Sequence, residues 1–182
     1  ETVNALYRRV IPAQAVVLDL MASHDSHLQG VSPANLHLLG MQAEELAANR
    51  AAHNRVVHDL NHSPVLPFAN NTLDALVCTA SIEYLIRPAE VLAESLRALR
   101  PGGVCMITFS NRWFPSKAIR IWSELHEFER VGMLTQWLQQ AGYTQLHTFS
   151  ARGWPRPADD IHARETSNAD PVYAVWGFKP DA

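Results

Sequence analysis

The chain has 182 residues, of which 47% are hydrophobic and 18% charged, and its formal net charge at pH 7 is −3. This length fits one domain, and the apolar share is enough for a core, which excludes a disordered chain. The negative charge argues against nucleic acid as a partner, and no apolar run reaches the ~20 residues that a membrane-spanning helix needs.

Short apolar runs in the first 110 residues predict a series of buried strands. We expect strands over 16–21, 36–41, 55–58, 74–80 and 104–109, because continuous apolar runs are typical of strands buried on both faces of a parallel sheet. Apolar spacing predicts helices over 3–10, from Ala43 onwards, and over 88–100, where Pro88 suits the first turn and Pro101-Gly102-Gly103 ends the helix. Alternating strands and helices with right-handed crossovers give a doubly wound α/β sheet.

The last third of the chain predicts two helices and two closing strands. Apolar residues at helical spacing lie between 118 and 128 and between 133 and 141, and Gly142 ends the second helix. The strands are expected over 143–149 and 172–178, and a long surface loop over 150–171 separates them. We therefore expect one domain over 1–182, with its core over 14–110 and C-terminal helices and closing strands over 115–180.

The cysteine content and the first residues of the chain indicate where the protein is located in the cell and whether upstream residues are missing. Cys78 and Cys105 are too few for a disulfide framework and fall in neighbouring predicted strands, so we expect small buried apolar residues and a cytoplasmic location. No secretory signal opens the chain. It begins with Glu1 rather than Met, which is consistent with missing upstream residues.

Polar or small residues follow each predicted strand of the first half. In an open α/β sheet, ligands bind beyond the carboxyl ends of the strands, near the point where strand order reverses. The segments that begin these tips are therefore expected to share one edge; they start at Asp19, Gly40, Asp59, Thr79 and Ser110.

Three stretches of the chain form a recognisable set: Val17-Leu18-Asp19-Leu20, the Leu66-Pro67-Phe68 stretch that runs to Asp74, and Leu96-Arg97-Ala98-Leu99-Arg100-Pro101-Gly102-Gly103. Together they resemble class I S-adenosylmethionine-dependent methyltransferases of type 11, the small-molecule group that includes the ubiquinone and menaquinone methyltransferases. The 23 positions from Asp19 to Gln42 suit a strand, one helix and a second strand.

This resemblance implies a Rossmann-like, mostly parallel seven-stranded sheet with helices on both faces. It also implies transfer of a methyl group from S-adenosylmethionine to a small-molecule substrate, with S-adenosylhomocysteine as the product. Such catalysis depends on proximity and alignment, so no catalytic residue is identified.

The resemblance further implies roles for individual residues. Asp19 would organise the first loop and orient the amino-acid end of the cofactor. The backbone of Met21, Ala22 and Ser23 would pass close to the methionine portion of the cofactor. Gly40 and Met41, at the end of the second strand, would also bind the cofactor, and Gln42 falls where the family has an acid that holds the ribose hydroxyls. Asp59 would accept a hydrogen bond from the adenine amino group, Leu60 would pack on the ring, and Thr79 and Ala80 would face the sulfonium.

Two departures from the family pattern favour a second hypothesis. No glycine occurs between Asp19 and Gly30, although the family's first loop is rich in glycine, which permits positive φ and a close approach to the cofactor. Gln42 lacks the charge-assisted hydrogen bonding of a carboxylate. The alternative is a non-catalytic methyltransferase-like fold that acts as a binding or interaction module. A nicotinamide enzyme is disfavoured, because the glycine fingerprint after the first strand is absent.

Several residues keep alternative interpretations. Asp19 can cap a following helix or bond the loop backbone, and Asp59 can be an ordinary turn acid. Arg112 can bind an anionic substrate group or form a surface ion pair. Tyr84 can close a substrate pocket or pack in the core. The nine histidines predict no metal site. Those that are closely spaced are expected on loops and at a strand end, and no cysteine joins them.

Overall fold

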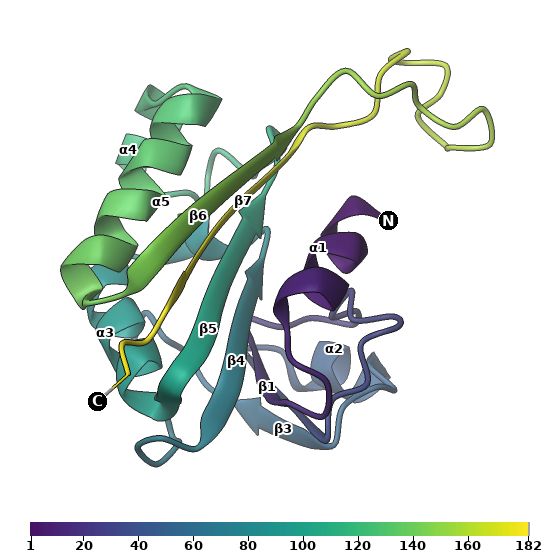
Figure 1. The fold of residues 1–182 in the computed structure, drawn as a ribbon. Helices are drawn as coiled ribbons and strands as arrows, with labels where there is room; N and C mark the ends of the chain where they lie inside the picture. The colour runs from purple at the N-terminus through teal and green to yellow at the C-terminus, as the bar shows by residue number, and fades with distance from the viewer. Residues whose placement is uncertain (182) are drawn as a thin grey trace.

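Seven strands form one open sheet in the order β3-β2-β1-β4-β5-β7-β6 in the computed structural model, which describes residues 1–181 (Figure 1). Strands β1 to β5 are parallel, and β7 runs antiparallel to both of its neighbours. The predicted mostly parallel seven-stranded sheet is therefore confirmed. The strands are β1 (Val16–Leu20), β2 (Asn35–Gly40), β3 (Asn54–Val57), β4 (Leu73–Thr79), β5 (Leu99–Phe109), β6 (Thr144–Ala151) and β7 (Val172–Phe178).

Helices cover both faces of this sheet (Figure 1). Successive residues of β4 point to opposite faces, so Leu76 packs on one side with α3, α4 and α5, and Val77 packs on the other with α1. Burial on both faces explains why the strands read as continuous apolar runs. The helices are α1 (Thr2–Val10), α2 (Ala43–Ala48), α3 (Pro88–Ala98), α4 (Arg120–Glu124) and α5 (Glu127–Ala141), with a 3₁₀ turn η1 (Ile82–Tyr84).

The connection between β1 and β2 differs from the expected one, because residues 21–34 form a loop instead of a helix. Local contacts favour the loop: the Asp25 carboxylate accepts the His27 amide at 2.8 Å, and Gly30 takes a φ of +82°. The α1 helix packs beside this loop, with the Asn4 amide donating to the Gln29 side chain at 2.9 Å. The predicted helix–strand alternation therefore fails at this crossover.

Boundaries in the second half shift for identifiable reasons. The α3 helix ends at Ala98, and β5 begins at Leu99 rather than 104 because Leu99 already pairs with Leu73. The break between the last two helices falls at His126, whose amide donates to Glu129 in a capping box at 2.7 Å. Gly142 ends α5 with a φ of +103°, as predicted.

The carboxyl edge of the sheet is where the chain can bind ligands. Strand order reverses between β1 and β4, which defines the switch point. The loop over 152–171, here named the arm, leaves β6 at the same edge, since Ala151 pairs with Val172 and Phe109 pairs with Tyr173. Within residues 1–181, no helix has the length and apolarity that crossing a bilayer would require.

Candidate functional site

Six of the predicted site residues surround one cavity at the ends of β1 and β2. This first-loop cavity has a volume of about 150 Å³ and is lined by Met21, Ala22, Ser23, Gly40, Met41, Gln42 and Glu45. Glu45 was missed by the sequence analysis, although it lies three positions after Gln42, a spacing that places two side chains on one helix face.

The first loop keeps a glycine-like backbone without a glycine. Met21 has a φ of +56°, in the left-handed region that favours glycine, and its half-buried side chain packs against the core and lines the cavity. The next amide, of Ala22, donates to the Leu39 carbonyl at 2.8 Å. A Cβ at Gly40 would collide with the Ala22 carbonyl oxygen, so the close crossing of the loop over β2 requires glycine at that position.

Asp19 lies beneath this loop and is only 2% exposed. Burial raises the pKa of its carboxyl to about 7, and a hydrogen bond with Ser26 opposes that rise. Asn49 then donates to the Ser26 hydroxyl at 2.9 Å and to the Ser23 carbonyl at 3.3 Å. Asp19 therefore belongs to a network that holds the non-helical crossover, and the capping alternative is wrong because a loop follows it.

A hydroxyl and a carboxylate meet at the mouth of the first-loop cavity. The Ser23 hydroxyl donates to the Glu45 carboxylate at 2.8 Å and lies 3.0 Å from the His24 ring nitrogen. This contact joins the first loop to α2.

Asp59 and Leu60 lie outside the lining of that cavity. One Asp59 carboxylate oxygen accepts the amides of Asn61 at 2.9 Å and His62 at 3.3 Å. Leu60 is 4% exposed and packs in the core. These contacts agree with the turn-acid interpretation of Asp59, and its role toward adenine stays a prediction.

The tip of β4 is held by a buried tyrosine that the sequence analysis did not single out. The Tyr7 hydroxyl of α1 lies 2.6 Å from the Thr79 hydroxyl, and burial raises the pKa of this phenol far above its ordinary value. Ala80 follows with a φ of +47°, and its amide donates to the Thr108 carbonyl at 2.8 Å. The β4 tip thus makes a second left-handed bend beside the switch point.

A larger cleft opens where β4 and β5 end. This β5-tip cleft has a volume of about 780 Å³ and is lined by Ala80, Tyr84, Ser110, Asn111, Arg112, Trp113, Phe114 and Pro115. The Phe114 amide donates to the Tyr84 hydroxyl at 3.1 Å, and the Arg130 guanidinium lies 5.4 Å from the Trp113 ring centroid. Tyr84 therefore lines this cleft, and its closing of a substrate pocket stays a prediction.

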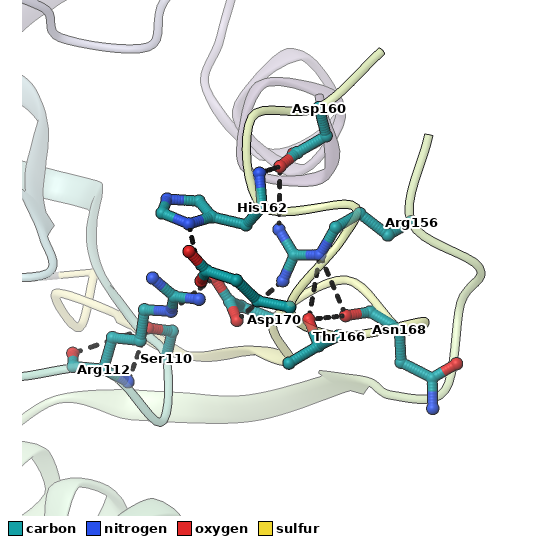
Figure 2. A network of polar contacts seen from close by, with 9 residues as sticks. Ser110, Arg112, Arg156, Asp160, His162, Thr166, Asn168 and Asp170 are labelled. Carbon is teal, nitrogen blue, oxygen red and sulfur yellow. Dashed lines mark hydrogen bonds and ion pairs between the residues drawn. The ribbon is translucent and has the colours of Figure 1, made fainter. Parts of the chain in front are cut away.

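The arm is organised around Arg156, whose side chain is only 4% exposed (Figure 2). Its guanidinium pairs with Asp160 and with Asp170, both at 3.1 Å, and donates to the Thr166 hydroxyl at 3.1 Å. The other oxygen of Asp170 pairs with Arg112 at 2.9 Å, which joins the arm to the segment after β5. Arg112 thus forms the ion pair that was one of its two alternatives.

Among residues 1–181, no group of three or more His, Cys, Asp or Glu side chains is arranged to hold a metal ion. Cys78 and Cys105 are buried free thiols in neighbouring strands, as expected.

Comparisons with known proteins agree with this architecture. Residues 15–107, just over half of the chain, match the family described as "Methyltransferase domain". The ubiquinone/menaquinone biosynthesis C-methyltransferase UbiE of Dinoroseobacter shibae is 35% identical over 100 residues, which cover 55% of this chain and 34% of that protein. The chain thus spans about a third of the length of the curated relatives it matches.

Solved structures show the same fold at low sequence identity. A chain of the complex between the Haloferax volcanii Trm112 methyltransferase activator and a methyltransferase has a TM-score of 0.66 and 18% identity, covering 98% of this chain and 88% of that one. Phosphoethanolamine N-methyltransferase 2 of Haemonchus contortus, solved with S-adenosyl-L-methionine, has a TM-score of 0.65 and 14% identity, covering 97% and 52%. These structures show the shared fold, and the family match over residues 15–107 shows that the chain belongs to the methyltransferase domain family.

Proposed function

We propose that this protein binds S-adenosylmethionine and transfers its methyl group to a small-molecule acceptor. The observation that carries the proposal is the placement of two hollows at one sheet edge. The first-loop cavity lies at the ends of β1 and β2, and the β5-tip cleft begins at Ala80, so they flank the switch point where α/β sheets bind ligands.

The residues around the first-loop cavity suit the cofactor in their chemistry. The left-handed backbone at Met21 follows the path that a glycine would take, so the loop can approach a ligand closely. Gln42 and Glu45 offer oxygen acceptors to the ribose hydroxyls. In this proposal Asp19 acts indirectly, because its contact with Ser26 keeps the loop in place.

The β5-tip cleft suits the acceptor. Its volume lies within the ~300–1,000 Å³ that is usual for small-ligand sites, and its lining combines three aromatic rings with a few polar groups, Ser110, Asn111 and Arg112. The rings of Tyr84, Trp113 and Phe114 would hold the acceptor beside Ala80. The cofactor, when bound, supplies an activated methyl group on its sulfonium, so the protein's task is alignment of the accepting atom.

One observation favours the alternative, a non-catalytic interaction module. At about 150 Å³, the first-loop cavity is smaller than an ordinary ligand site, and the Met21 side chain occupies part of its wall. Both functions predict the same fold and differ in whether the cofactor binds.

Calorimetric titration with S-adenosylhomocysteine and S-adenosylmethionine separates the two functions. Micromolar binding of either ligand supports the proposal. The absence of heat at millimolar ligand, with a protein shown to be folded, supports the interaction module instead.

A second titration tests the role of Asp59. The Asp59→Ala variant is expected to bind S-adenosylhomocysteine about tenfold more weakly if the carboxylate accepts the adenine amino group. Asp181→Ala, which changes an exposed acid at the far end of the chain, is the control. Unchanged affinity in Asp59→Ala, with a normal melting temperature, removes the adenine assignment and leaves the turn role.

A further inference from the structure

The first-loop cavity contains one carboxylate, and it comes from α2 instead of the end of β2. Glu45 lines the cavity together with Gln42, one helical turn before it. Position 42 is where the family resemblance expects the acid that holds the ribose, and this chain has an amide there. The charge missing at position 42 is therefore present in the same cavity on a neighbouring side chain.

Glu45 is available for a ligand. Its carboxylate accepts one hydrogen bond, from the Ser23 hydroxyl at 2.8 Å, through a single oxygen. Within residues 1–181, Glu45 takes part in no ion pair with a cationic side chain. A carboxylate offers about four lone-pair sites, so acceptor capacity remains after the Ser23 contact.

The chemistry of a ribose favours this carboxylate over the Gln42 amide. Two adjacent hydroxyls can donate together to the two oxygens of one carboxylate, whereas an amide has one acceptor oxygen. Hydrogen bonds to an ionised acceptor are also roughly twice as strong as neutral ones. Ser23 fixes the carboxylate from the first loop, which reduces the side-chain entropy lost on binding.

We infer that Glu45, held by Ser23, binds the vicinal hydroxyls of the cofactor's ribose in place of the acid expected at position 42. The inference rests on the proposed cofactor binding and extends it to a residue outside the family motifs. It makes Glu45 a binding residue and Ser23 a positioning residue.

The test compares Glu45→Gln with Glu44→Gln by calorimetry, using S-adenosylhomocysteine and its 2′-deoxy analogue as probes. Glu44 lies on the same helix, is exposed and is absent from the cavity lining, so its variant is a matched control. Glu45→Gln is expected to weaken S-adenosylhomocysteine binding by about 10- to 100-fold. The loss should be much smaller for the 2′-deoxy analogue, since one hydroxyl partner is already absent. Glu44→Gln should stay within about twofold of wild type.

A rescue variant separates a ribose contact from a structural effect. Adding Gln42→Glu to Glu45→Gln returns a carboxylate to the cavity and is expected to recover most of the lost affinity. Equal affinities of Glu45→Gln and Glu44→Gln, or an equal loss for both probes, would overturn the inference. If folded wild type binds neither probe, the proposed function itself fails, and that result is obtained before any variant is made.

Discussion

The two hollows at the carboxyl edge of the sheet are built in opposite ways. One wall of the first-loop cavity, of about 150 Å³, is a backbone crossing that leaves no space for a Cβ at Gly40 and that follows the left-handed Met21. The β5-tip cleft, of about 780 Å³, is lined by exposed side chains such as Phe114, which is 64% exposed. A backbone wall that the fold requires therefore borders the first-loop cavity, whereas the β5-tip cleft is shaped mainly by side chains such as Phe114.

The largest effect should follow a methyl group added at the loop crossing. Gly40→Ala places a Cβ against the Ala22 carbonyl oxygen and is expected to destabilise the protein by about 3 kcal/mol, at the upper end of overpacking effects. Gly132→Ala in α5 is the control, because its Cβ would meet nothing within 4 Å, and it should stabilise by about 0.5–1 kcal/mol. Urea unfolding of both variants measures this, and equal stabilities would show that the crossing is not tight.

The next effect concerns the acid beneath the first loop. The pKa of Asp19 is about 7 in the folded protein and near 3.8 when exposed, so between these values the folded state keeps a proton that the unfolded state has lost. Stability should therefore fall as pH rises from about 4 to about 7, by at most about 1.4 kcal/mol per pH unit from this group. Asp19→Asn should lack this slope and become more stable than wild type above pH 7. Parallel curves for the two proteins, from unfolding at each pH, would contradict the assigned pKa.

A smaller effect is expected on ligand affinity when the left-handed residue becomes glycine. Met21→Gly relieves roughly 1 kcal/mol of backbone strain and removes a side chain from the cavity wall. We expect about tenfold tighter binding of S-adenosylhomocysteine by calorimetry, with stability within about 1 kcal/mol of wild type because packing is lost as strain is relieved. Met41→Ala, in the same cavity without positive φ, should change affinity less than twofold. Weaker binding by Met21→Gly would show that Met21 contacts the ligand.

The smallest effect belongs to the open cleft. Phe114→Ala removes a largely exposed ring and should change stability by less than about 0.5 kcal/mol and leave S-adenosylhomocysteine affinity unchanged. A loss of more than about 1 kcal/mol in thermal unfolding would mean that the fold depends on this cleft as well, and the contrast between the two hollows would disappear.

Local signals in the sequence predicted most of the strands of the sheet and several helix ends. The strand over 172–178 has the predicted bounds, and Gly142 and Pro88 mark helix ends as their backbone chemistry requires. Six of the predicted site residues gather at one cavity because parallel strands end at a shared edge.

Tertiary contacts explain what the sequence did not predict. The loop that replaces the predicted crossover helix depends on a network that joins Asp19 to Ser26 and, through Ser26, to the distant Asn49. No motif links these residues. The contact between Ser23 and Glu45 likewise forms only once the first loop lies beside α2. The role of Tyr7 depends on α1 packing over the tip of β4, which helical periodicity alone does not place.

The Arg156 guanidinium at the centre of the arm affects which substitutions the arm can tolerate. Because Arg156 pairs with Asp160 in the middle of the arm and with Asp170 near its end, the arm is held by its own contacts. The Arg112–Asp170 pair joins it to the segment after β5. Mutations at exposed tip positions such as Ile161, which is 88% exposed, can accumulate without unfolding the sheet. The arm is thus a part of the molecule where surface chemistry can change while the sheet stays the same.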